Sequence, residues 1–263
     1  MFTNPLKMRL QQGLPAVGHW ISMPSASVAE ILATHGPDWL LVDTEHGPIT
    51  WDTLEDILRA LKGTDIPPLA RVRANDASII KQVLDRGVYG VLVPLVNTAE
   101  EARAAVAACK YPPEGMRGVA GTRVTGYGRT LPDYFERWNS QVVVGVQIET
   151  TEALANVEKI AAVPGVDILF IGPNDLSASL GLFRQYDHPE FTRAVDRILK
   201  AAQAHRVAAG YMCFGPEEVL QKIDQGFRFL AAGSDARLLS GAMAATYQKI
   251  REGIEARLKT ARA

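Results

Sequence analysis

Short apolar runs alternate with amphipathic stretches along the whole chain. Several runs, such as VVVGVQI at 142–148, are too uniformly apolar for a strand that is exposed on one face. Such runs are typical of parallel strands buried on both faces. They predict eight strands, at residues 17–23, 39–43, 69–73, 90–95, 142–148, 167–171, 207–212 and 227–232.

The stretches between these runs carry the periodicity of amphipathic helices. The last one, at 239–258, places an apolar residue at every third or fourth position. Eight strand–helix units in 263 residues predict one α/β domain over residues 1–263, a (β/α)8 TIM barrel. A doubly wound sheet fits less well, because it usually has fewer units and no G-x-G-x-x-G follows the first run. Helix N-caps are expected at Ser25 or Ser27, Asp76, Thr98 and Thr151.

Composition narrows the class of protein. The chain is 47% hydrophobic and 22% charged, with a net charge of −1, which argues against binding to nucleic acid or to an anionic membrane. Two cysteines, Cys109 and Cys213, exclude a disulfide framework and a cysteine metal cluster. No apolar run reaches the roughly 18 residues of a spanning helix, and no apolar signal core opens the chain. We therefore expect a cytoplasmic protein.

Charged and polar side chains gather at the carboxyl ends of the predicted strands, where TIM barrels carry their chemistry. Each has an ordinary structural interpretation as well. Asp175 could cap a short helix, Glu149 could favour the dipole of the next helix, and Arg71 could be half of an ion pair. His46 could be a structural histidine. Their coincidence at one end of the barrel nevertheless favours an active site. The strand ends supply Asp43-Thr44-Glu45-His46, Arg71, Gln147-Ile148-Glu149 and Asn174-Asp175.

These residue types permit a narrow range of chemistry. Glu149 and Asp175 offer the hard oxygen ligands that Mg²⁺ or Mn²⁺ prefers. Arg71 can hold an anionic oxygen with a forked pair of donors. His46 titrates near neutrality and can move a proton. Since a metal facing a keto acid stabilises an enolate, the set predicts proton removal beside a carbonyl, with a carbon–carbon bond made or broken.

Six motifs run in order from about residue 17 to 235: LVDTEHGP, PLARVR, VLDRGVYGVLVPLVNTAEEA, YPPEGMRGVAG, VGVQIET and ILFIGPNDLSASLG. Together they resemble the class II pyruvate aldolases of the 4-hydroxy-2-oxoheptanedioate aldolase family, in the phosphoenolpyruvate/pyruvate superfamily. The resemblance implies a reversible aldol reaction between an aldehyde and pyruvate, or a related 2-keto acid such as hydroxypyruvate. It implies an enolate held on a divalent cation, which could be Mg²⁺, Mn²⁺ or Co²⁺.

The resemblance also assigns roles. His46 is expected to be the acid/base, Arg71 to stabilise the enolate, and Glu149 and Asp175 to bind the metal. Asp43 is a second acidic neighbour by position. Gln147, Asn174 and the backbone of Asp175 are expected to contact pyruvate.

Asp85 matches an aspartate that raises the basicity of the histidine in this family. It falls late in a predicted helix, just before the fourth strand, and hence near the opposite end of the barrel. We expect it to reach His46 of a neighbouring subunit, which requires a homo-oligomer, a trimer or hexamer. The helix at 239–258 is compatible with exchange between subunits and equally with packing on its own barrel.

The connection at 111–141 is long and rich in Gly and Arg, so it is expected to be functional or disordered. Arg123, Tyr127 and Arg129 could contact the aldehyde, or the segment could be solvated or lie between subunits. Lys81 and Lys110 fall on predicted helices, so no Schiff-base lysine is evident.

Other functions remain open on the sequence. The same enolate could serve oxaloacetate decarboxylation or an acyl-CoA lyase, although the absence of an added C-terminal domain disfavours the latter. A phosphate-handling isomerase or a non-catalytic ligand-binding barrel are the remaining alternatives.

Overall fold

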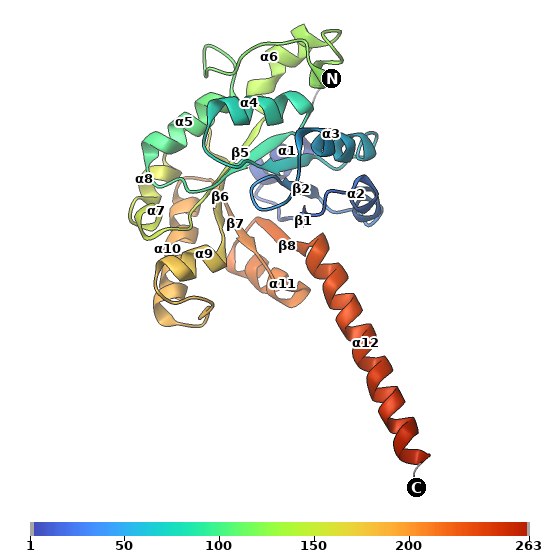
Figure 1. Cartoon of the computed structure of the whole chain (residues 1–263). Helices are drawn as coiled ribbons and strands as arrows, with labels where there is room; N and C mark the ends of the chain where they lie inside the picture. Colours follow the sequence, from blue (N-terminus) through green and yellow to red (C-terminus); the bar gives the residue numbers. More distant parts are fainter. Residues whose placement is uncertain (1–2, 262–263) are drawn as a thin grey trace.

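The computed structural model describes residues 3–261 and contains a closed barrel of eight parallel strands (Figure 1). Each strand pairs with the next along the chain, and β8 closes the ring against β1. The predicted (β/α)8 barrel is confirmed, with strand boundaries that shift by a few residues. The strands are β1 (Ala16–Ile21), β2 (Trp39–Asp43), β3 (Pro68–Arg71), β4 (Gly90–Val93), β5 (Val143–Gln147), β6 (Ile168–Ile171), β7 (Ala208–Met212) and β8 (Phe229–Ser234).

Helices follow the strands and surround the barrel (Figure 1). The expected caps Ser25, Asp76 and Thr98 each accept a backbone N–H bond at a helix start, whereas Thr150 takes the place expected for Thr151. The helices are α1 (Pro5–Gln11), α2 (Ala26–Ala33), α3 (Trp51–Ala60), α4 (Ala77–Arg86), α5 (Ala99–Cys109), η1 (Arg123–Thr125), α6 (Leu131–Gln141), α7 (Thr151–Ala155), α8 (Val157–Ala161), α9 (Pro173–Ser179), α10 (Pro189–Ala204), α11 (Pro216–Gln225) and α12 (Asp235–Thr260).

Large side chains fill the inside of the barrel. Trp39 and Phe229 stack with ring centroids 4.1 Å apart, and Leu6 of α1 belongs to the same buried cluster. Position 18 must be glycine, because a Cβ there would lie 2.3 Å from the Trp39 ring. A second cluster packs the strands against the outer helices. Because side chains fill the interior of the barrel, a ligand-binding site is expected at the ends of the strands.

The connection at 111–141 is ordered. It contains η1 and α6, and α6 packs through the buried side chains of Tyr134 and Trp138. Trp138 Nε1 donates to the carbonyl of Cys109 at 2.7 Å, which ties α6 to the end of α5. The disordered alternative is therefore wrong. The aromatic spacing within LPDYFERW was the signal for a helix here.

The final helix α12 runs away from the barrel over most of its length (Figure 1). Its apolar stripe lies exposed in the single chain and does not pack on its own barrel there. The exposed residues are Leu239, Met243, Tyr247, Ile250, Ile254 and Leu258. Among the described residues, no helix is both long and apolar enough to cross a membrane.

Candidate active site

A buried ion pair organises the mouth of the barrel at the ends of β2 and β3. Arg71 Nε donates to Asp43 Oδ1 at 2.9 Å, and Arg71 Nη2 donates to Asp43 Oδ2 at 2.7 Å. Glu45 Oε2 lies 2.8 Å from Arg71 Nη1, and the guanidinium stacks 4.4 Å above the ring of Trp20. Arg71 is thus an ion-pair partner, as one interpretation of the sequence had it. A guanidinium has five N–H groups, so this pairing leaves donors for a substrate oxygen.

The turn that carries His46 is built on the same carboxylate. Asp43 Oδ1 accepts the backbone N–H groups of Glu45, at 3.1 Å, and His46, at 3.3 Å. The His46 residue is exposed at the mouth. Burial raises the pKa of Glu45, while the neighbouring charges of Arg71 and His46 oppose that rise. The arrangement places an exposed imidazole beside a fixed cation and two carboxylates.

Glu149 and Asp175 approach each other across Gly172. A methyl group added at Gly172 would lie 3.3 Å from Glu149 Oε2, 3.3 Å from Asp175 Oδ2 and 3.6 Å from Gln147 Nε2. The missing Cβ therefore leaves a small gap that the two carboxylates border. Both carboxylates therefore lie near the Gly172 backbone, and a cation bound between them would reach an oxygen of each.

Asp175 does not cap a helix, and Glu149 does not lie in the first turn of the next helix, although the sequence allowed both roles. The N-cap of α9 is Gly172, without a side-chain bond, and Asp175 lies inside the first turn, so the capping interpretation of Asp175 is wrong. Glu149 precedes α7, which begins at Thr151, and is only 4% exposed. Asp175 is exposed at the mouth, whereas the buried Glu149 accepts hydrogen bonds from Leu95 and Gln147.

The protonation of Glu149 depends strongly on its surroundings. Burial is the main cause that raises its pKa to about 7. The charges of Asp175 and Glu45 act in the same direction, whereas the backbone N–H of Leu95 and the charge of Arg71 act against it. Because a cation beside a carboxylate favours its ionised form, a bound metal would reverse this shift.

The surrounding donor set fits a hard divalent cation. Gln147 donates through Nε2 to Glu149 Oε2, while its buried Oε1 has no hydrogen-bond partner among the described residues. That acceptor suits a water molecule or a substrate hydroxyl. Within residues 3–261, no group of three or more His, Cys, Asp and Glu side chains is arranged to hold a metal ion. A cation at Gly172 would take two protein carboxylates, and water or substrate oxygens would complete its shell, as Mg²⁺ commonly requires.

Asn174 lies at the same mouth, on the first turn of α9. The Tyr186 hydroxyl donates to Asn174 Oδ1, and the Tyr186 ring stacks on Phe214 with centroids 5.7 Å apart. This bond leaves the Asn174 amide nitrogen as a donor toward solvent or a ligand.

Asp85 lies at the far end of the barrel from His46. It is the penultimate residue of α4, directly before β4, where the sequence placed it. Its Oδ1 lies 2.8 Å from Nη2 of Arg117, whose side chain is fully buried, with the guanidinium 4.7 Å from the Tyr111 ring centroid and 4.6 Å from that of Trp138. The single chain therefore does not bring Asp85 to its own His46.

Two of the loop residues that could contact the aldehyde, Arg123 and Tyr127, are also at that far end. Arg123 Nη1 donates to the carbonyl of Arg86 at the end of α4, at 2.6 Å, and Tyr127 is exposed nearby. Neither residue reaches the mouth of its own barrel.

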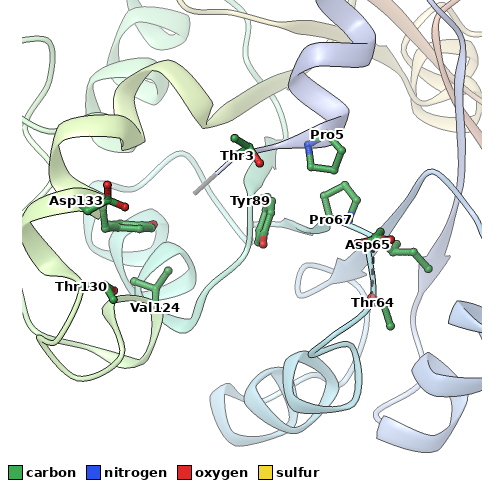
Figure 2. A pocket seen from close by; sticks show the side chains of 11 residues that line it. Thr3, Pro5, Thr64, Asp65, Pro67, Tyr89, Val124, Thr130 and Asp133 are labelled. Atoms are coloured by element: carbon green, nitrogen blue, oxygen red, sulfur yellow. Dashed lines mark hydrogen bonds between the residues drawn. The ribbon is translucent and has the colours of Figure 1, made fainter. Parts of the chain in front are cut away.

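A cavity of about 570 Å³ opens at the same far end (Figure 2). Figure 2 shows Tyr89 between Pro5 on one side and Asp133 on the other. None of the site residues expected from the sequence lines it. The chemistry expected from the sequence therefore does not lie in this cavity.

Sequence reasoning missed three contributors to the mouth. They are the backbone N–H of Leu95, the side chain of Tyr186, and Glu45 as a partner of Arg71. Glu45 was visible in DTEH, next to His46. The other two lie in connections that follow β4 and β6, and nothing in the local pattern distinguishes them.

The eight-stranded barrel with charged groups at its carboxyl mouth is that of a (β/α)8 enzyme. A model of the HpcH/HpaI aldolase/citrate lyase family matches residues 16–242, and the chain belongs to this family of the phosphoenolpyruvate/pyruvate superfamily. The protein is accordingly a carbon–carbon lyase.

Similar proteins match over nearly the full chain. A hydroxypyruvate/pyruvate aldolase of Paraburkholderia phytofirmans is 41% identical over 257 residues, which cover 95% of this chain and 98% of the relative. A 5-keto-4-deoxy-D-glucarate aldolase of Salmonella paratyphi C is 39% identical, covering 95% and 96% of the two chains. The crystal structure of a family member from Burkholderia cenocepacia superposes with a TM-score of 0.90 at 37% identity, covering 95% of this chain and all of that one.

Proposed function

We propose that the protein is a metal-dependent class II aldolase that joins pyruvate, or a related 2-keto acid, reversibly to an aldehyde. The observation that carries this proposal is the meeting of Glu149 and Asp175 at the gap beside Gly172. Two carboxylates with open space between them suit a divalent cation such as Mg²⁺, Mn²⁺ or Co²⁺. Arg71 and His46 at the same mouth supply the charge stabilisation and the proton transfer that the reaction needs.

Each residue at the mouth has a separate role in the proposed reaction. Glu149 and Asp175 would hold the cation, which supplies Lewis-acid stabilisation of the enolate charge. The free N–H groups of Arg71 bind the substrate oxygen that gains negative charge. An imidazole nitrogen of His46 removes a proton from the carbon beside the carbonyl. The resulting carbanion attacks the aldehyde carbon, and His46 returns the proton to the new hydroxyl. Cleavage follows the same steps in reverse.

Binding of the keto acid uses the neighbouring polar groups. We assign Gln147, Asn174 and the backbone of Asp175 to contacts with the carboxylate and keto oxygens. Gln147 is held by Glu149 and Asn174 by Tyr186, so both amides are oriented before a substrate arrives.

The active oligomer, in this proposal, is a trimer or hexamer. Asp85 of one subunit reaches His46 of the next and raises its basicity, and α12 is exchanged between subunits. The exposed apolar stripe on α12 supports the exchange, because such a surface is stabilised by burial against another chain. The fixed pairing of Asp85 with Arg117 leaves its second oxygen for that role.

The relatives carry names for different substrates, hydroxypyruvate or pyruvate in one and 5-keto-4-deoxy-D-glucarate in the other. We propose that this chain shares the keto-acid half of the reaction with them. The narrower assignment as a 4-hydroxy-2-oxoheptanedioate aldolase rests on the sequence motifs alone. A screen of aldehydes against fixed pyruvate, with product detected by mass spectrometry, identifies the acceptor.

Proton exchange tests the central step without knowledge of the aldehyde. Pyruvate in D₂O is incubated with the enzyme and each metal, and the methyl signal is followed by proton NMR. We expect the signal to disappear with Mg²⁺, Mn²⁺ or Co²⁺, to persist after chelation, and to persist with Glu149→Gln. Persistence of the signal with the wild-type protein and every metal would contradict the proposal.

A further inference from the structure

The connection after β4 contains a leucine in an unusual backbone conformation. Leu95 has a φ of 52°, in the left-handed region that a branched side chain rarely adopts, and the residue is 58% exposed. Such a conformation costs free energy and persists only when its surroundings enforce it. In this conformation the backbone N–H of Leu95 donates to Glu149 Oε1 at 2.8 Å.

Asn97 enforces that conformation through a set of bonds. Its Nδ2 donates to the carbonyl of Leu95 at 3.2 Å, and its Oδ1 accepts from the Thr150 hydroxyl. Its backbone N–H donates to Glu101 Oε2 at 2.6 Å, and its backbone carbonyl accepts from Asn156 Nδ2 at 3.0 Å. Asn97 therefore joins the connection after β4 to the one after β5, and both connections border Glu149.

The direction of these bonds decides how the Glu149 carboxylate is turned. The backbone N–H of Leu95 donates to Oε1 of Glu149, whereas Oε2 is the oxygen that borders the gap at Gly172. Oε2 also accepts from Gln147 Nε2. Without the Leu95 N–H bond, the bond from Gln147 alone would hold the carboxylate, which could then turn about that bond and move Oε2 away from Gly172. Partners that orient a metal-binding side chain in this way commonly control the affinity for the metal.

We propose that Asn97 is a positioning residue, which holds the strained Leu95 turn so that its N–H fixes Glu149 in the orientation that binds the cation. Asn97 itself contacts neither the cation nor the substrate. The inference rests on the proposed function, since it takes Glu149 as a metal-binding residue.

Titration of the full-length, metal-free protein with Mn²⁺, followed by electron paramagnetic resonance, tests the inference. Asn97→Asp keeps the acceptor for Thr150 and removes the donor to Leu95, while Asn97→Ala removes both. We expect each variant to bind Mn²⁺ about 10-fold more weakly, with an altered spectrum of the bound ion. Activity should fall at limiting Mn²⁺ and recover substantially when Mn²⁺ is in excess.

Asn75→Ala is the matched control. Asn75 is also half-buried in a connection at the barrel mouth, and its Nδ2 donates to a backbone carbonyl, that of Glu101, at 2.9 Å. It makes no hydrogen bond to the Leu95 turn or to Glu149 among the described residues. We expect the Asn75 variant to keep the wild-type Mn²⁺ affinity.

A second substitution tests whether the strained turn is the link. Glycine adopts a positive φ without strain, so Leu95→Gly in the Asn97→Ala background should recover part of the lost Mn²⁺ affinity. Because glycine also relieves backbone strain, Tm is measured beside the Mn²⁺ affinity. A gain in affinity without a matching gain in Tm assigns the effect to the turn and not to the general stability of the fold.

The possible results separate the two proposals. If the wild-type protein binds Mn²⁺ and Glu149→Gln abolishes that binding, but both Asn97 variants bind like the wild type, the positioning role is overturned and the proposed function stands. If Glu149→Gln leaves Mn²⁺ binding unchanged, the metal assignment fails, and the inference about Asn97 fails with it.

Discussion

Asp43 holds the guanidinium of Arg71 by both carboxylate oxygens, at 2.9 Å from Nε and 2.7 Å from Nη2. Both side chains are buried, and the pair lies against the Trp20 ring. A two-point bond of this kind fixes the plane of the guanidinium as well as its position. The cation at the barrel mouth is therefore rigid before a substrate binds.

Arg71→Lys tests the value of that rigidity. Lysine keeps the charge but cannot make the planar, two-point contact with Asp43. We expect kcat for pyruvate exchange to fall about 100-fold, the usual loss when an oriented donor to a charged transition state is removed. Arg59→Lys, in an exposed ion pair with Glu55 on α3, should leave kcat unchanged. A wild-type rate in Arg71→Lys would remove the residue from the reaction.

The pKa of Glu149 predicts how the metal-free protein responds to pH. Burial raises this pKa from its ordinary 4.5 to about 7, so the folded protein binds more protons than the unfolded chain between these values. The free energy of unfolding should therefore fall as pH rises through this window, by about 3 kcal/mol in total, and level off above pH 7. Urea unfolding at several pH values should show a smaller decline in Glu149→Gln.

An exposed acid provides the comparison for that experiment. Glu152→Gln, in the first turn of α7, removes a carboxyl group that water already solvates. We expect its pH profile of stability to follow that of the wild type. An equal change in both variants would show that Glu149 is not the source of the pH dependence.

Gly172→Ala should fill the gap between the two carboxylates. The added methyl lies 3.3 Å from Glu149 Oε2 and from Asp175 Oδ2, and the backbone at Gly172 is one that alanine adopts freely. We expect Mn²⁺ affinity to fall at least about 10-fold while Tm changes little.

Gly215→Ala is the matched change at the same end of the barrel. Gly215, like Gly172, is a helix N-cap followed by proline, but the nearest atom to its added methyl is Glu217 Oε2 at 3.6 Å. Unchanged Mn²⁺ affinity is expected there. Equal losses in the two variants would argue against a cation at Gly172.

Subunit exchange through α12 predicts a change of molecular mass. Ile250→Glu places a charge in the exposed apolar stripe, whereas Ala245→Glu places the same charge on the opposite side of the helix. Light scattering after size exclusion should find smaller assemblies for Ile250→Glu alone. Identical masses for both variants and the wild type would contradict burial of the stripe between subunits.

Mixing two inactive variants tests the proposed action of Asp85 across subunits. Subunits with Asp85→Ala retain His46, and subunits with His46→Ala retain Asp85. If the residues meet between chains, dissociating and reassociating the mixture creates some complete sites, and part of the activity returns. If no activity returns although hybrid oligomers are detected, Asp85 does not act in trans.

The barrel and the set of side chains at its mouth could be predicted from the sequence. Strand and helix periodicities are local, and parallel strands present their carboxyl ends on one side, so His46, Arg71, Glu149 and Asp175 could be placed together without coordinates. The location of Asp85 at the opposite end followed from the same rule.

Which atoms come into contact depends on the three-dimensional arrangement of the strands. The Leu95 N–H reaches Glu149 across 54 positions, because β4 and β5 are neighbours and the turn after β4 takes a positive φ. The two carboxylates share a gap because residue 172 lacks a side chain. The periodicity of apolar residues is a property of neighbouring positions in the sequence, so it predicts helices and strands. Hydrogen bonds between distant residues depend on how the closed barrel aligns its strands. No local sequence pattern encodes that alignment.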